Sequence, residues 1–190
     1  ISSNGADNAT QINTTSVTNS GTISAQGNNH ITAATVQNSG TLAAGRELKV
    51  NATDIDNTNG VMNGQRVEVN AASLNNTKGK IQQTGSQALA LNAGSLSNTN
   101  GGLIGYEPIT SGSGTGTGST GGSTGGAGGS TGTTDTPSTA AGGGTASVVQ
   151  PAPVVLADGL INVTGNINND AGQITANGGI DLTSNNGLTN

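Results

Sequence analysis

The chain has 190 residues, a net charge of −5 and only 8% charged residues, and it contains 33 Gly, one Tyr and no Phe, Trp or Cys. So few large side chains exclude a wide globular core, and the scarcity of Lys and Arg argues against nucleic-acid binding. The sequence contains no run of about 20 apolar residues, so it predicts no transmembrane helix. The chain begins in the middle of a repeat pattern, so we expect it to be a piece of a longer protein.

A repeat of 19 to 22 residues organises most of the chain. The segment VTNSGTI at residues 17–23 returns as VQNSGTL at residues 36–42. Self-similarity at such a period is typical of solenoid proteins, in which each unit buries its apolar side against its neighbours. The apolar residues that open the units are predicted to form one inward core column, which contains Val17, Val36, Ile55, Leu74, Leu96, Ile167 and Leu188.

An asparagine stands two residues after each of these apolar positions, and a glycine follows it closely in the first six units. Asn tolerates left-handed backbone angles at a corner, and stacked Asn side chains can bond one another along an axis. The glycines, Gly21, Gly40, Gly60, Gly79, Gly101 and Gly172, are predicted to supply positive φ where the chain bends. A structural column is favoured over a sugar- or calcium-binding row, and it contains Asn19, Asn38, Asn57, Asn76, Asn98, Asn169 and Asn190.

Each unit holds three short segments with apolar residues two apart, separated by Gly, Asn and Ser. Apolar residues that recur at every second position predict strands, and the Gly, Asn and Ser residues between them predict turns. Apolar residues do not recur at the three- and four-residue intervals of a helix. Stacking identical strands about 4.8 Å apart would pair each one with its copies in the neighbouring units. The predicted fold is therefore all-β, a parallel β-helix with coils of about 19–22 residues and a thin aliphatic core.

Charge placement is consistent with stacking in register. When two consecutive units are aligned on Val50 and Val69, Glu47 falls opposite Arg66 and Lys49 falls opposite Glu68. Both positions flank the inward side chains and are expected to face solvent, where each pair adds only a few tenths of a kcal/mol. Two complementary pairs in neighbouring columns therefore support the alignment more than they support stability.

The period is lost in a Gly/Ser/Thr-rich segment at residues 105–157. We predict β-helix coils over residues 1–104, a flexible loop or linker over 105–157, and resumed coils over 158–190. The segment either loops out of one coil or links two separate rods. The loop is favoured because the free energy of loop closure grows only logarithmically with length.

The repeated pattern resembles the haemagglutinin repeats of filamentous-haemagglutinin-like exoproteins. The likeness is carried by VQNSGTLAAGRELKVNA at residues 36–52 and by the units over residues 74–104, and it covers all but the Gly/Ser/Thr-rich segment. The resemblance implies a right-handed β-helical rod, secreted through an outer-membrane transporter by the two-partner route. Members of the family act as adhesins, and some deliver a toxin in contact-dependent inhibition.

β-Helices also include polysaccharide lyases and hydrolases, which need clustered carboxylates or a carboxylate beside a cation. Asp54 and Asp56 flank Ile55, but no carboxylate or cation occupies the equivalent positions of the adjacent coils. His30 is the single histidine and has no carboxylate in its column. We therefore expect no enzyme activity, no cofactor and no metal site.

We expect a structural and adhesive segment of a large secreted bacterial exoprotein that acts at the cell surface in attachment and virulence. Its partners would be a receptor or glycan on a host or neighbouring cell and the outer-membrane transporter during secretion. Two alternatives stay open, namely the stem of a contact-dependent toxin delivery protein and a β-helical polysaccharide-degrading enzyme. Their discrimination needs the sequence beyond this chain or an assay of polysaccharide cleavage.

Overall fold

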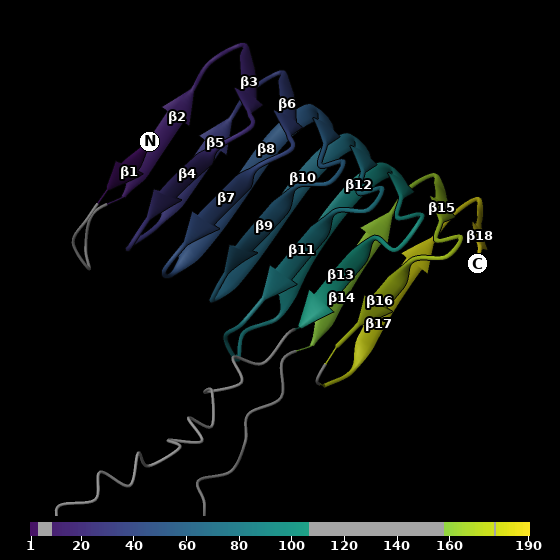
Figure 1. Cartoon of the computed structure of the whole chain (residues 1–190). Helices are drawn as coiled ribbons and strands as arrows, with labels where there is room; N and C mark the ends of the chain where they lie inside the picture. The colour runs from purple at the N-terminus through teal and green to yellow at the C-terminus, as the bar shows by residue number, and fades with distance from the viewer. Residues whose placement is uncertain (4–8, 107–157, 177) are drawn as a thin grey trace, which may run out of the picture. The chain divides into compact units, whose positions relative to one another are not determined.

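The computed structural model describes residues 1–3, 9–106, 158–176 and 178–190. These residues form a stack of short parallel strands with no helix among them, so the predicted all-β parallel solenoid of roughly 20-residue coils is confirmed (Figure 1). None of the described residues therefore belongs to a helix that could cross a membrane. Most of the predicted Gly/Ser/Thr-rich insertion, residues 107–157, lies outside the described residues.

Three rows of strands make up the solenoid. The first is a seven-stranded sheet with the order β1 (Ser2–Ser3), β4 (Thr22–Ala25), β7 (Thr41–Ala44), β9 (Val61–Gly64), β11 (Lys80–Gln83), β13 (Leu103–Tyr106) and β16 (Gln173–Thr175). The second row contains β2 (Thr10–Asn13), β5 (Asn29–Thr32), β8 (Glu47–Asp56), β10 (Arg66–Asn75), β12 (Leu89–Ser97), β14 (Gly159–Val163) and β17 (Ile180–Ser184). The third row begins with β3 (Ser16–Asn19) and β6 (Thr35–Asn38) and ends with β15 (Asn166–Asn168) and β18 (Gly187–Thr189).

The middle coils join the second and third rows in single strands. β8 and β10 each run for 10 residues and β12 for 9. β8 pairs with β5 and then β6, β12 pairs with β14 and then β15, and β10 pairs with β8 and β12 along its length. The sequence predicted separate short segments here. The strands instead continue without a break and bend at Ala52 and its equivalents.

The same stack continues across the Gly/Ser/Thr-rich segment. Leu91 in β12 pairs with Ile161 in β14, and Ile104 in β13 pairs with Ile174 in β16. The coils before and after the segment therefore belong to one solenoid. This arrangement is what a segment that loops out of a single coil requires. Each junction is an ordinary parallel pairing.

The core is a thin stripe of aliphatic side chains along the inside of the stack. Val17, Val36, Ile55, Leu74, Leu96 and Ile167 are all buried and pair in register with one another. The last position predicted for this column, Leu188, pairs with Ile167 but is 52% exposed. β18 is the last strand of its row, so no described strand covers Leu188.

Candidate functional site

The seven asparagines of the predicted column lie in register and form a hydrogen-bonded ladder inside the solenoid. In each pair the side-chain Nδ2 donates to the Oδ1 of the next asparagine along the chain, at 2.7–2.8 Å. The Nδ2 atoms also donate to backbone carbonyls, as Asn76 does to Gly79 at 3.2 Å and to Leu103 at 3.1 Å. All members except the exposed Asn190 are buried. The ladder thus satisfies buried carbonyls at the corner, a structural role.

Most of the neighbouring glycines are needed for close approach. This corrects the predicted role in positive φ at Gly40, Gly60, Gly79 and Gly172, whereas Gly101 has the predicted positive φ, at 85°. A Cβ on Gly79 would lie 2.2 Å from the carbonyl oxygen of Asn57 and 2.5 Å from Oδ1 of Asn76. Gly40, Gly60 and Gly172 are equally crowded. The fifth coil also corrects the column, because Gly102 packs against Asn98 and the predicted Gly101 has open space beside it.

Positive φ occurs one residue earlier in most of these turns. Asn59, Lys78 and Ala171 have φ of 59°, 55° and 54° and directly precede the crowded glycines. Left-handed backbone is unfavourable for most side chains and is tolerated best by Asn and Gly. The sequence predicted positive φ at the glycine in these turns and not at the residue before it. A recurring glycine is compatible both with positive φ and with close approach of the backbone, so the pattern alone does not distinguish the two.

We expect Gly79→Ala to destabilise the solenoid, because the added methyl group collides with the backbone and with the ladder. The midpoint of urea denaturation, followed by circular dichroism, should fall by an amount equivalent to about 2 kcal/mol or more. Gly21→Ala is the matched control, since its Cβ would have nothing within 4 Å. Equal midpoints for the two variants would show that the glycine column is not set by packing against the ladder.

A cluster of charged residues crosses three coils on the outer side of the second row. Arg66 bonds Glu47 in the coil before it and also Glu68 at 3.0 Å. Lys49 bonds Glu68 at 2.8 Å. The two ion pairs expected from the alignment therefore form, and the bifurcated Arg66 joins them into one network.

His30 belongs to this network. The expectation that its column holds no carboxylate is wrong, because the column continues from His30 through Lys49 to Glu68. Its Nε2 lies 3.0 Å from Oε2 of Glu47, which stands diagonally in the next coil. The sequence alignment did not predict this contact, because it pairs only residues that lie directly opposite each other. Long side chains also reach diagonal neighbours in a sheet. The contact gives His30 a polar partner within the network.

The ammonium group of Lys49, which hydrogen-bonds the carboxylate, holds the pKa of Glu68 below its ordinary value of 4.5. A carboxyl group with a lowered pKa in the folded state adds stability that is complete above its unfolded pKa and is lost as pH falls through the folded pKa. We therefore expect the urea midpoint to fall as pH drops below about 4.5, beyond the decrease seen in a Lys49→Gln variant. Parallel pH profiles for the two proteins would contradict this linkage.

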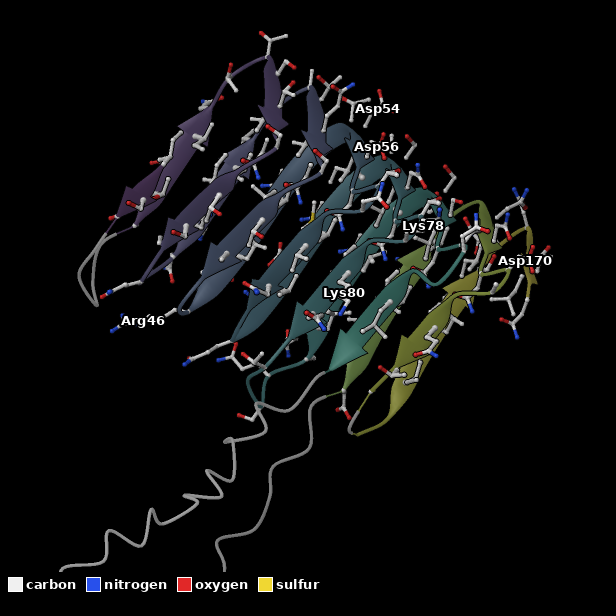
Figure 2. The ribbon with its side chains drawn as sticks, viewed as in Figure 1. Arg46, Asp54, Asp56, Lys78, Lys80 and Asp170 are labelled. Carbon is white, nitrogen blue, oxygen red and sulfur yellow. The ribbon has the colours of Figure 1, made fainter. Side chains whose placement is uncertain are left out.

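Asp54 and Asp56, the carboxylates considered for catalysis, accept hydrogen bonds from uncharged side chains. Asp54 accepts a bond from Ser73, and Asp56 accepts bonds from Thr58 and Asn75. Figure 2 places both at the opposite end of the coils from Arg46. Across the described residues no three His, Cys, Asp or Glu side chains are grouped so that they could hold a metal ion.

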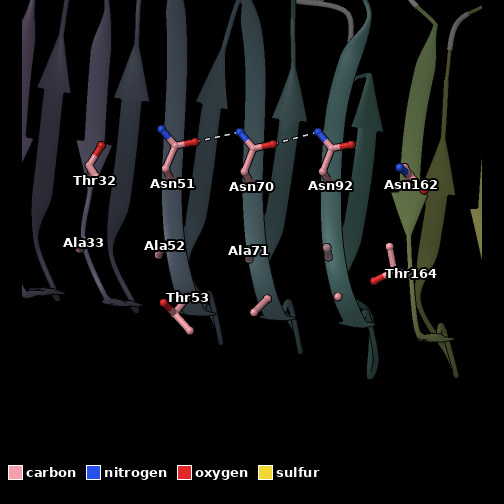
Figure 3. A pocket seen from close by; sticks show the side chains of 13 residues that line it. Thr32, Ala33, Asn51, Ala52, Thr53, Asn70, Ala71, Asn92, Asn162 and Thr164 are labelled. Atoms are coloured by element: carbon pink, nitrogen blue, oxygen red, sulfur yellow. Dashed lines mark hydrogen bonds between the residues drawn. The ribbon is translucent and has the colours of Figure 1, made fainter.

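A groove lies along the solenoid where β8, β10 and β12 bend (Figure 3). Its volume is about 680 Å³, and it spans five consecutive coils. The sequence did not predict this groove, because the concave arrangement of its alanines depends on the direction in which the strands turn. Its lining comprises Thr32, Ala33, Asn51, Ala52, Thr53, Asn70, Ala71, Ala72, Asn92, Ala93, Gly94, Asn162 and Thr164.

Comparison of the chain with family models, with curated proteins and with solved structures gave no match. The fold and the geometry of its surfaces are therefore the basis for a functional proposal.

Proposed function

We propose that this chain is a structural and adhesive segment of a large secreted bacterial exoprotein. The proposal rests on the regular stack of coils, in which core, asparagine and glycine columns repeat from coil to coil. The resemblance of these coils to haemagglutinin repeats supports an adhesive role. In this proposal the chain leaves the cell through an outer-membrane transporter and has no enzymatic activity.

A solenoid suits this task because its length increases with every coil while its cross-section stays the same. The seven strands of the first sheet, spaced about 4.8 Å apart, span roughly 30 Å. Each coil contacts mainly its neighbours, so coils can be added without redesign of a central core. Such a rod holds its lateral surfaces at a distance from the cell that carries it.

The proposal is tested by attachment of protein-coated beads to cultured epithelial cells. Beads coated with the full chain should be retained several-fold more than beads coated with the Leu74→Asp variant, in which the stack is disrupted. Equal retention of the two preparations would mean that the folded solenoid does not mediate adhesion. Albumin-coated beads set the background.

A further inference from the structure

The groove defined above carries a second, external row of asparagines. The Asn70 Nδ2 donates to Oδ1 of Asn51 at 2.8 Å and to Oε1 of Glu68 at 3.1 Å, and the Asn92 Nδ2 donates to Oδ1 of Asn70 at 2.9 Å (Figure 3). Among the described residues, the amide nitrogen of Asn51 has no acceptor and Oδ1 of Asn92 has no donor. Asn162 extends the row by one coil, because it pairs in register with Asn92. This row therefore offers unused donors and acceptors to a ligand.

The chemistry of the groove favours an uncharged ligand. None of its thirteen lining residues is charged, although charged residues occupy the neighbouring outer surface. The hydroxyl groups of Thr32, Thr53 and Thr164 add further donors and acceptors, and alanine methyl groups supply an apolar lining. The groove has a volume of about 680 Å³ and is shallow and open to solvent, so it suits a ligand that lies along the surface.

We infer that this groove binds an uncharged glycan chain that lies along the axis of the solenoid. The inference builds on the proposed adhesive function and names the class of partner. Sugar hydroxyl groups both donate and accept hydrogen bonds, so they can bond the free amide nitrogen of Asn51 and the free Oδ1 of Asn92 at the two ends of the row. The apolar faces of the sugar rings would pack on the alanine methyl groups.

The spacing of the amides favours a glycan over a peptide. Successive asparagines of the row are one coil apart, about 4.8 Å. A chain of linked pyranose rings advances by a similar distance per ring. Alternate rings of a β-1,4 chain turn over, but every ring carries hydroxyl groups on its edges, so each coil can meet a hydroxyl group. An extended peptide presents groups on the same side only every second residue, about 6.6–6.8 Å, and loses register within two coils.

Isothermal titration calorimetry with the full chain and cellohexaose, an uncharged chain of six linked glucose rings, tests the inference. We expect saturable binding that is weakened about fivefold or more in Asn51→Leu, which removes the free amide nitrogen at one end of the row. Asn92→Leu, which removes the free Oδ1 at the other end, should weaken binding similarly, and its exposed position leaves the core unchanged. Asn63→Leu, on the outer side of the first sheet, is the matched control and should bind as the parent does.

Several outcomes would overturn the inference. These are absence of binding at millimolar cellohexaose, equal binding by all three variants, and stronger binding of oligogalacturonate or of an extended Ser/Thr decapeptide. Bead attachment separates this inference from the proposed function. A chain that attaches to cells without binding cellohexaose refutes the groove assignment alone, whereas a chain that binds cellohexaose without attaching to cells refutes adhesion alone.

Discussion

Replacing Leu74 by Asp is expected to disrupt several neighbouring coils. Leu74 is 2% exposed and stacks between Ile55 and Leu96 in the core column. An unpaired carboxylate at this position loses its hydration without gaining a partner, at a cost of several kcal/mol. Because each coil is stabilised by the coils beside it, local unfolding at Leu74 should spread to both sides.

Limited proteolysis followed by mass spectrometry measures this spread. New cleavage sites should appear in at least the two coils that flank Leu74, and the β signal in circular dichroism should decrease. Leu188→Asp is the matched control, because Leu188 occupies the same column but is 52% exposed. Protease resistance equal to that of the parent in Leu74→Asp would contradict the assigned register.

Replacing Asn76 by Leu is expected to have the second largest effect. Asn76 is fully buried, and its amide donates to two backbone carbonyls and to Oδ1 of Asn98. Leucine has a similar size but leaves Oδ1 of Asn98 without its donor and removes the Oδ1 that accepts from Nδ2 of Asn57, whereas the Gly79 carbonyl keeps the bond from the Leu103 amide. Each buried polar group that loses a partner costs about 1–3 kcal/mol, so we expect a loss of about 2 kcal/mol or more.

Urea denaturation of Asn76→Leu, followed by circular dichroism, measures this loss as a lower midpoint. Asn190→Leu is the control, since Asn190 is the exposed last member of the ladder and only accepts a bond from Asn169. The control should unfold close to the parent. A midpoint for Asn76→Leu as high as that of the control would show that the internal ladder contributes little to stability.

The interior also contains a polar residue that no pattern in the sequence indicated. Asn29 occupies the row in which later coils place Leu48, and it is fully buried. Its amide donates to the carbonyls of Ile23 and Ala43, which explains how an asparagine is accommodated there. Among the described residues its Oδ1 has no hydrogen-bond partner, so the site is only partly satisfied.

The amino-acid sequence by itself determined the period, the strand type and the register of this solenoid. Those properties follow from residues that recur at fixed intervals, so aligning Val36, Ile55 and Leu74 was enough to place Glu47 opposite Arg66. The tertiary structure alone decided what the recurring glycines do, which diagonal neighbour His30 contacts, and where the bend of β8, β10 and β12 leaves a groove. These features depend on distances between coils and on the direction of each bend, and a linear spacing of residues does not encode either one.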